Sequence, residues 1–408
     1  MKKIGKVDIK DIVAEHSSPV YVYDKNKIIE NYNKLNNAFT SRYKNTKIHF
    51  SVKANSNINV LKTFLDIGAG TDCSSPIEYL YSKKAGFPND RILYTGNYES
   101  IEDFKTIAFE KDLKLNLDDI TSLERLSKIN IPERISFRIN PGIGRGGFEG
   151  ITTGGTDAKF GIPYEKALSA YKYAQSLGIK RFGIHMMTGS NNLEPYFFGE
   201  IVDKLLMISY EIFKELGTTP EYVDIGGGYG IPYRDDEQEL NVDLTAQIVT
   251  DVFKEKCTKY GFGEPQLILE PGRYLVANAG YLVTQVTGIK EGYKKFIGLN
   301  AGMNFLIRPA MYGAFHRAEV YGKTEKTEHV NLCGQICENS DIFAKNLDFP
   351  KVEVGDIVTF LDAGAYGFVM SSNYNNRLRP AELLIDGETI KVIRKKETIE
   401  DLLRLIIE

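Results

Sequence analysis

The 408-residue sequence lacks several features that mark particular classes of protein. Four cysteines are too few for a disulfide scaffold and fit a reducing compartment. No apolar run approaches the roughly 20 residues of a membrane span, and charged residues interrupt the N-terminus where a signal peptide would be apolar. Lys and Arg total 51 against 54 Asp and Glu, so the basic excess of a nucleic-acid-binding protein is absent. We therefore expect a cytoplasmic protein with neither a membrane nor a nucleic-acid partner.

Eight short runs rich in β-branched and aromatic residues predict β-strands. They cover residues 47–54, 70–74, 91–96, 113–117, 134–140, 181–187, 222–227 and 266–270. Between several of them, apolar residues recur at helical spacing, as in 58–66, 76–84, 164–177 and 196–216. Strands that alternate with helices in this way predict an α/β fold, a (β/α)8 barrel of the TIM type. A doubly wound parallel sheet is the alternative, because strand order is not visible in a sequence.

The pattern changes near residue 276, where strand-like runs follow one another with few helical intervals. At about 150 residues per domain, a chain of this length has room for a second domain. We expect a C-terminal β-sandwich or β-barrel domain that the N-terminal strand at 20–24 completes. The predicted domains are then residues 25–275 for the barrel and residues 1–24 plus 276–408 for the β-domain.

One glycine-rich tract, residues 142–155, has seven glycines in fourteen positions. It follows the fifth predicted strand, so it is either a surface connection or a lid over the mouth of the barrel. The sequence does not decide between these two interpretations.

Lys53 lies near the C-terminal end of the first predicted strand, where His49, Ser51 and Lys53 alternate onto one face. In a barrel that face can point inward, and a lysine there is costly unless it is paired or used chemically. A rim lysine with a solvated head is the structural alternative. Partial burial favours a neutral, nucleophilic amine, so the functional interpretation is an amine that binds an aldehyde.

Two glycine-containing turns follow the seventh and eighth predicted strands. Residues 226–228 (GGG) form the first turn, and residues 270–273 (EPGR) form the second. The loops after these two strands commonly hold a phosphate in such barrels, and glycines let the backbone approach a ligand closely. Glu270 would repel a phosphate, so we expect it to face another part of the site. A carboxylate beside a pyridine nitrogen would keep that nitrogen protonated and make the ring a stronger electron sink.

Ten stretches from about residue 20 to residue 385 carry a resemblance to a known family. They are SVKAN, GTDCSSPIEYL, GNYES, RINPG, KFGI, GGGYGIPY, EPGRYLV, AGMNFLIRPAMYGAFH, CGQICENSD and GAYGFVMSSNYNNRLRPAE. In them the chain resembles the alanine-racemase-like enzymes of fold type III that depend on pyridoxal 5'-phosphate (PLP), and among these the diaminopimelate decarboxylase family. The resemblance implies a PLP-dependent carboxy-lyase of lysine biosynthesis, which removes a carboxylate from meso-2,6-diaminopimelate to give L-lysine.

The resemblance also implies a role for each matching residue. Lys53 would bind the cofactor aldehyde covalently, and Cys337 would donate the proton that replaces the lost carboxylate. The cofactor would further contact Met187, Ser190, Gly227, Gly228, Glu270, Pro271, Gly272, Arg273 and Tyr366. The amino-acid substrate would contact Arg273, Arg308, Tyr312, Glu338 and Tyr366. Cys337 and Glu338 would come from the second subunit of a homodimer, so that the two subunits share their active sites.

Diaminopimelate carries an ammonium and a carboxylate on its distal carbon, and Glu338 with Arg308 offers the matching pair. Lysine and ornithine lack the distal carboxylate, so a decarboxylase of either would have less use for Arg308. A decarboxylase of another diamino acid or polyamine precursor is the first alternative function. An amino-acid racemase and a non-catalytic PLP-binding protein are the other two.

One position departs from the family pattern. Most relatives have a histidine on the sixth strand that stacks on the cofactor ring, and Met187 stands there in this chain. Either the polarizable sulfur of Met187 packs on the ring, or His185 reaches it from two residues earlier.

The remaining cysteines and histidines are interpreted as structural. Cys333 and Cys337 could form half of a metal site, but no second Cys or His pair has metal-ligand spacing, so we predict no metal. We assign Cys73 and Cys257 to the core. His16, His316 and His329 are assigned to structural positions.

Overall fold

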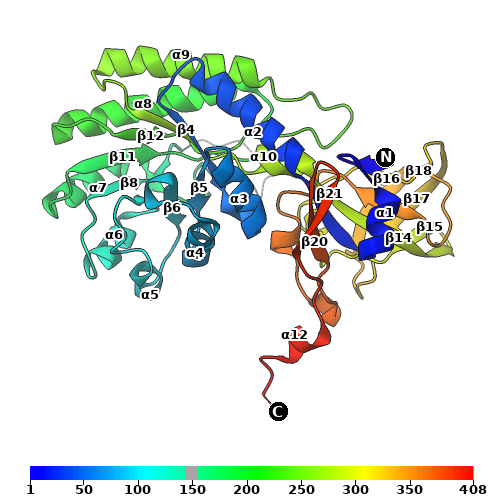
Figure 1. Cartoon of the computed structure of the whole chain (residues 1–408). Coiled ribbons are helices and arrows are strands. Elements are labelled where there is room, and N and C mark those ends of the chain that lie inside the picture. Colours follow the sequence, from blue (N-terminus) through cyan, green and yellow to red (C-terminus); the bar gives the residue numbers. More distant parts are fainter. Residues whose placement is uncertain (143–153, 408) are drawn as a thin grey trace. The chain divides into compact units, whose positions relative to one another are not determined.

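The computed structural model describes residues 1–142 and 154–407, and Figure 1 shows its helices and strands. The chain divides into two compact units. The barrel unit comprises residues 31–232 and 238–274, and the sheet unit comprises residues 1–30, 233–237 and 275–408. The glycine-rich tract 142–155 lies almost entirely outside the described residues, so neither interpretation of it is tested.

Eight parallel strands form a closed barrel in the barrel unit. They are β4 (Thr46–Ser51), β5 (Gly70–Cys73), β6 (Ile92–Gly96), β7 (Lys114–Leu117), β8 (Arg134–Phe137), β11 (Arg181–His185), β12 (Tyr222–Asp224) and β13 (Gln266–Leu269). Leu267 of β13 pairs with Thr46 of β4, so the last strand in the sequence closes on the first. The predicted TIM-type barrel is confirmed, and the doubly wound alternative is excluded because such a sheet has two open edges.

Helices cover the outside of the barrel strands (Figure 1). In chain order they are α2 (Lys25–Thr40), α3 (Ile58–Asp66), α4 (Pro76–Ala85), α5 (Ile101–Lys105), α6 (Ile120–Ser127), α7 (Tyr164–Ser176), α8 (Pro195–Leu216) and α9 (Val242–Tyr260), and the short α10 (Arg273–Val276) follows β13. Local sequence sets their limits, as α4 illustrates. Ser75 caps its first turn, Pro76 occupies the first helical position, and Gly86 ends it in the left-handed conformation.

Nine strands of the sheet unit form one mixed sheet. They are β3 (Val20–Asp24), β14 (Gly280–Glu291), β15 (Lys295–Leu299), β16 (Ala318–Val320), β17 (Lys326–Cys333), β18 (Ile342–Pro350), β19 (Ile357–Phe360), β20 (Ala381–Asp386) and β21 (Thr389–Arg394). The N-terminal β3 lies between β14, to which it is antiparallel, and β20, to which it is parallel. The prediction that an N-terminal strand completes the C-terminal β-domain is confirmed.

Shorter elements complete the described structure. In the sheet unit they are β1 (Lys3–Ile4), β2 (Val7–Asp8), α1 (Ile9–His16), α11 (Arg308–Tyr312) and α12 (Ile399–Leu403), and in the barrel unit β9 (Ile139–Asn140) and β10 (Ile162–Pro163). The 3-10 turns are Val52–Ala54, Asn89–Arg91, Ala277–Ala279, Phe368–Met370 and Tyr374–Asn376. Aliphatic side chains of α1, β3 and β20 pack into one core of the sheet unit.

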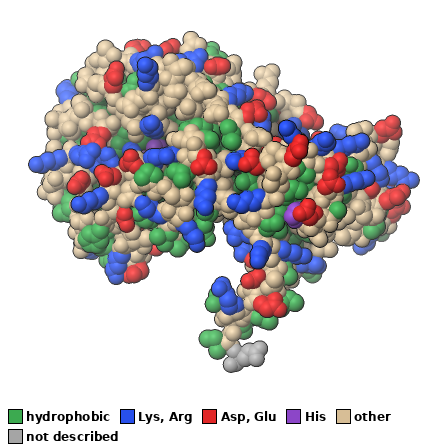
Figure 2. Space-filling model, viewed as in Figure 1, with side chains coloured by type: hydrophobic (Ala, Val, Ile, Leu, Met, Phe, Trp, Pro, Cys, Tyr) green, Lys and Arg blue, Asp and Glu red, His purple; other side chains and the backbone are tan. Residues whose placement is uncertain are grey.

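The surface carries both signs of charge. On the face in Figure 2, Lys and Arg side chains are interspersed with Asp and Glu. This agrees with the near balance of 51 basic and 54 acidic residues. Across the part of the chain that the structure describes, no helix combines the length and the apolar character that a membrane span requires.

Candidate active site

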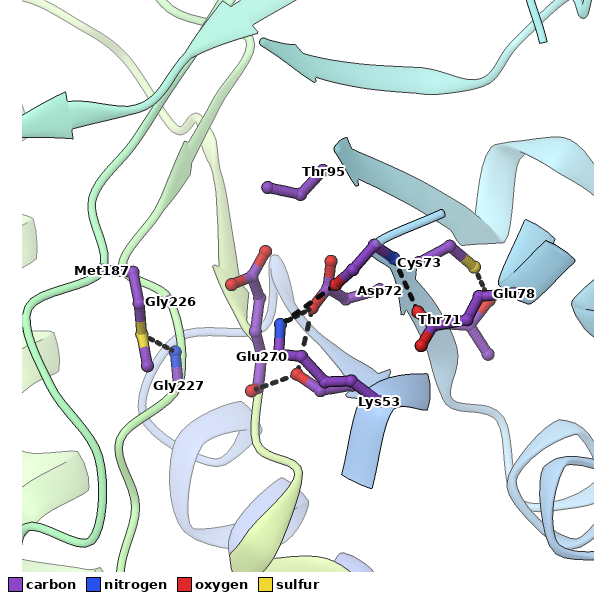
Figure 3. Close-up of polar contacts among 12 residues, drawn as sticks. Lys53, Thr71, Asp72, Cys73, Glu78, Thr95, Met187, Gly226, Gly227 and Glu270 are labelled. Atoms are coloured by element: carbon purple, nitrogen blue, oxygen red, sulfur yellow. Dashed lines mark hydrogen bonds and ion pairs between the residues drawn. The ribbon is translucent and has the colours of Figure 1, made fainter. Parts of the chain in front are cut away.

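Lys53 lies at the C-terminal edge of the barrel. β4 ends at Ser51 and the chain turns through Val52–Ala54, so Lys53 stands just after the strand. The predicted strand, residues 47–54, had included it. Its Nζ is 2.9 Å from Oδ2 of Asp72 on β5; the Lys53 side chain is 43% exposed, whereas Asp72 is fully buried. In Figure 3 the amine points toward Asp72 and lies beside Glu270. A buried carboxylate therefore holds an accessible amine.

Asp72 is a site residue that sequence reasoning missed. Its Oδ2 also accepts a hydrogen bond from Ser51 Oγ at 3.0 Å. Burial raises the pKa of Asp72, the charge of Glu270 raises it further, and the ion pair with Lys53 opposes both. The sequence feature that could have revealed Asp72 is an aspartate inside a buried strand, where a charge is tolerated only if it has a partner.

Glu270 directly follows β13 and is 5% exposed. Its Oε2 is 3.2 Å from Nε2 of His185. Burial alone would raise the pKa of Glu270, but His185 and, after it, Lys53 hold the pKa below its ordinary value. Glu270 therefore stays ionised.

Asp224, on the neighbouring β12, is a second carboxyl group close to Glu270. Polar atoms of His185, Asp224 and Glu270 lie within 4.8 Å of one another. Burial, and then the charge of Glu270, raise the pKa of Asp224 well above its ordinary value. Asp224 therefore keeps its proton, and Glu270 carries the negative charge of this group.

Three loops approach one another closely beside Glu270. A Cβ on Gly227 would lie 2.4 Å from the backbone oxygen of Glu270, and one on Gly228 would lie 3.1 Å from the backbone oxygen of Gly189. Gly228 also has a φ of 95°, which other residues rarely adopt. These glycines are therefore needed for the packing of the loops themselves, in addition to any role in binding a ligand.

Met187 contacts the glycine turn from the loop after β11. The strand ends at His185, so Met187 lies beyond it, although the predicted strand 181–187 included it. The N–H of Gly227 donates a hydrogen bond to Met187 Sδ at 3.2 Å (Figure 3). His185, in contrast, is buried, and its two ring nitrogens contact Asn116 and Glu270. Of the two candidates for contact with the cofactor ring, only Met187 is partly exposed.

Ser190 and Arg273 come together from two loops. Arg273 Nη2 donates a hydrogen bond to Ser190 Oγ at 3.2 Å. Two residues before Arg273, the backbone oxygen of Pro271 accepts a hydrogen bond from the N–H of Ser51 at 3.3 Å. The EPGR segment, with Gly272 at its centre, is thus tied both to β4 and to the loop after β11.

The residues of the barrel unit fit PLP. The accessible amine of Lys53 suits the aldehyde, and the ionised Glu270 suits a protonated pyridine nitrogen. Arg273 and Ser190 supply a cation and a hydroxyl group for a phosphate.

Arg308 and Tyr312 stand at the two ends of α11 in the sheet unit. Arg308 is 2% exposed; its Nη1 is 2.8 Å from Nε2 of His316, and its guanidinium carbon lies 4.6 Å from the centre of the Tyr233 ring. His316 Nδ1 is 3.0 Å from the carbonyl oxygen of Leu361, so Nδ1 carries the proton and Nε2 accepts from Arg308. His316, which the sequence suggested was only structural, positions the guanidinium of Arg308.

Cys337 and Glu338 lie on an exposed turn after β17. The N–H of Cys337 donates to Asn375 Oδ1 at 2.8 Å, and the hydroxyl of Tyr374 donates to Glu338 Oε1 at 2.5 Å. The turn Tyr374–Asn376 therefore holds both residues.

Tyr366 has a φ of 55°, in the left-handed region that bulky residues rarely adopt.

Comparison with known sequences identifies the family. Residues 25–277 match the family model described as pyridoxal-dependent decarboxylase, pyridoxal binding domain. The chain is 42% identical over 405 residues to the diaminopimelate decarboxylase of Methanothermobacter thermautotrophicus, with 98% of this chain and 94% of that protein covered. It is 38% identical over 408 residues to the diaminopimelate decarboxylase of Thermoplasma acidophilum, with 100% and 97% covered.

Solved structures show the same likeness. The diaminopimelate decarboxylase of Helicobacter pylori, complexed with L-lysine, matches with a TM-score of 0.90 and 32% identity, covering 98% of this chain and 99% of that chain. A lysine/ornithine decarboxylase of Vibrio vulnificus, complexed with cadaverine, matches with a TM-score of 0.80 over 93% of this chain and 97% of that chain, but at 22% identity it shows only the shared fold. The chain therefore belongs to the diaminopimelate decarboxylase family of PLP-dependent carboxy-lyases.

Proposed function

We propose that this chain decarboxylates meso-2,6-diaminopimelate at its D-configured centre, releasing CO2 and forming L-lysine. The observation that carries the proposal is the accessible amine of Lys53 beside an ionised, buried Glu270 at the open end of the barrel. Two relatives that match nearly the whole chain bear the name diaminopimelate decarboxylase, and a similar solved structure holds L-lysine, the product of this reaction.

PLP, when bound, supplies the conjugated ring that delocalises the electron pair left on the substrate by the loss of CO2. In the proposal, residues 25–275 form the cofactor-binding domain, where Lys53 holds the cofactor through Nζ and Asp72 keeps that amine in place. Glu270 would hold a proton on the pyridine nitrogen. The other contacts come from Met187, Ser190, Gly227, Gly228, Pro271, Gly272, Arg273 and Tyr366.

Cys337 is proposed to deliver the proton that takes the place of the lost carboxylate. Its thiol is exposed, and a thiol is a proton donor of suitable strength near neutral pH. In the proposal, Cys337 and Glu338 serve the active site of a second subunit, so the working unit is a homodimer. Residues 1–24 and 276–408 then form the domain that supplies substrate and dimer contacts.

Recognition of the distal carbon decides the substrate. The proposal assigns the distal ammonium to Glu338 and the distal carboxylate to Arg308, whose planar guanidinium can grip a carboxylate with two hydrogen bonds. Tyr312, Tyr366 and Arg273 complete the substrate contacts. Because lysine and ornithine lack the distal carboxylate, an enzyme that uses Arg308 in this way distinguishes diaminopimelate from both.

Release of CO2 from meso-diaminopimelate, lysine, ornithine and arginine tests the proposal. We expect kcat/KM for diaminopimelate to exceed the others by roughly 10- to 100-fold, the size of a lost hydrogen bond between charged groups. Chiral analysis should find only L-lysine, and Lys53→Ala is the control that should release no CO2.

Other outcomes would replace the proposal. Preferred release of CO2 from lysine, ornithine or arginine would indicate a decarboxylase of another diamino acid. Diaminopimelate with altered configuration and no CO2 would indicate a racemase. Binding of PLP with neither reaction would indicate a non-catalytic PLP-binding protein.

A cytoplasmic location is also part of the proposal. None of the four cysteines, all of which are described, forms a disulfide, and this suits a reducing compartment. The proposed substrate is a small amino acid that needs neither a membrane nor a nucleic acid.

A further inference from the structure

His185 is buried inside the barrel, at the C-terminal end of β11, and is 1% exposed. Its Nδ1 is 2.8 Å from Nδ2 of Asn116 on β7, and its Nε2 is 3.2 Å from Oε2 of Glu270. It therefore links the wall of the barrel to the carboxylate that the proposed function places at the cofactor's ring nitrogen.

The groups behind Asn116 fix the direction of these hydrogen bonds. The hydroxyl of Tyr222 donates to Ser136 Oγ at 3.0 Å, and Ser136 Oγ donates to Asn116 Oδ1 at 2.9 Å. Since Oδ1 accepts from Ser136, the amide nitrogen of Asn116 faces His185, and an amide nitrogen only donates. Nδ1 of His185 must then be the nitrogen without a proton, and Nε2 carries the proton that is donated to Glu270.

This direction favours ionisation of Glu270 over that of its neighbour Asp224. Asp72, Asp224 and Glu270 are all buried, and the charge of Glu270 disfavours ionisation of the other two. The N–H of His185 stabilises the anion of Glu270, while Asp224 keeps its proton. The carboxyl group of Asp224 also forms a hydrogen bond with Glu270, so Glu270 has two partners that stabilise its anion.

We propose that His185 is a positioning residue that fixes both the charge and the orientation of Glu270. The chain of hydrogen bonds Tyr222–Ser136–Asn116–His185, here called the relay, presents an N–H to Glu270 and to no other carboxylate. His185 thus acts on the cofactor's ring nitrogen through Glu270 and not by stacking on the ring. The inference rests on the proposed function, in which Glu270 holds a proton on that nitrogen.

Nitrogen-15 NMR of the PLP-loaded full chain, labelled at its five histidines, tests the direction of the relay without measuring catalysis. The signals of His185 are assigned by their loss in His185→Gln. We expect an unprotonated Nδ1 and a protonated Nε2. Asn116→Asp replaces the donor by an acceptor and should bring a proton to Nδ1. A protonated Nδ1 in the wild-type protein would overturn the relay.

His185→Phe removes the donor, whereas His185→Gln retains an N–H that can face Glu270. We expect His185→Phe to weaken PLP binding roughly 10- to 100-fold, as the loss of a hydrogen bond to a charged group implies. The pH at which the absorbance of the bound cofactor changes should shift, and kcat should fall while KM changes little. His185→Gln should restore most of each value.

His49→Phe is the matched control, because His49 is also a buried histidine of the barrel interior. It has no hydrogen bond to Glu270 among the contacts of the described residues, so it should leave the absorbance profile unchanged. Should His185→Phe fail to fold, Asn116→Leu removes the group behind His185 and must shift the same profile. A wild-type profile in folded Asn116→Leu would contradict the inference.

Glu270→Gln separates a failure of the relay from a failure of the proposed function. If Glu270→Gln alters cofactor absorbance and kcat while folded His185→Phe leaves both unchanged, the relay is refuted and the proposed function stands. If Glu270→Gln itself leaves both unchanged, Glu270 has no role at the ring nitrogen, and this inference fails together with that part of the proposed function.

Discussion

Gly227→Ala tests whether the close approach of backbone segments shapes the cofactor site. The added Cβ would lie 2.4 Å from the backbone oxygen of Glu270 and 3.2 Å from its carbonyl carbon. Cβ atoms essentially never approach within 3.0 Å of such an atom, so the carbonyl must move from 2.4 Å to at least 3.0 Å, or by about 0.6 Å. That carbonyl also accepts a hydrogen bond from Ser51 Oγ at 3.0 Å, so its movement disturbs the end of β4.

Overpacking of this kind costs about 1–3 kcal/mol. We expect Gly227→Ala to lower the free energy of unfolding by that amount, measured by urea denaturation of the full chain. Displacement of Glu270 should also weaken PLP binding by roughly 10-fold for each 1.4 kcal/mol, measured by absorbance titration. Gly288→Ala is the control, because a Cβ there meets no atom within 4 Å. If both variants are equally stable and bind PLP like the wild type, the reasoning is refuted.

Four other substitutions test separate parts of the molecule. Lys53→Ala should lack the absorption band of lysine-linked cofactor, and an unchanged spectrum would remove Lys53 from its proposed role. Cys337→Ala should bind PLP normally but lose most turnover; near-normal kcat would place the proton donor elsewhere. Arg308→Lys keeps the charge but loses the planar fork, so kcat/KM for diaminopimelate should fall by the equivalent of roughly 1–3 kcal/mol, and no change would assign the distal carboxylate to another group. Burial raises the pKa of Glu99 from 4.5 to about 7, so the folded chain holds a proton that the unfolded chain releases between these pH values. The free energy of unfolding should therefore fall by up to about 3 kcal/mol as the pH rises through this range. Glu99→Gln should remove that fall. The prediction is contradicted if the urea midpoint of unfolding changes by the same amount between pH 5 and pH 8 in the variant and in the wild type.

The barrel could be predicted from the sequence because its signals are local. Helices α3 and α7 agree with the predicted 58–66 and 164–177 to within one residue, because helical periodicity lies within each segment. Four predicted strands run two or three residues past the true ends of β4, β8, β11 and β12. The residues that follow, such as Val52 and Met186, are apolar and fully buried in the loops, so they resemble strand residues in the sequence. For this reason the predicted strands included Lys53 and Met187, which the structure places in the loops that follow.

The partners of the site residues were harder to predict than the residues themselves. Lys53 and Glu270 could be singled out because each stands at a strand end beside turn-forming residues. Their partners lie on other strands: Asp72 is 19 residues from Lys53, and His185 is 85 residues from Glu270. Hydrophobic periodicity carries no information about which strands become neighbours. His316 was missed for the same reason, because its role depends on contacts with α11 and with Leu361.

Strand register supplies the information that local patterns lack. His185 pairs with Asp224 across β11 and β12, and Ser51 pairs with Asp72 across β4 and β5. Glu270 follows β13, which lies between β12 and β4. The barrel thus gathers three carboxyl groups at the same end of β12, β13 and β5, with β4 between the last two, and these groups cannot all be ionised. His185 offers an N–H to Glu270 and Lys53 pairs with Asp72, whereas Asp224 keeps its proton. In the proposal, His185 therefore sets the charge at the ring nitrogen from inside the barrel, while Met187 contacts the glycine turn from the loop after β11.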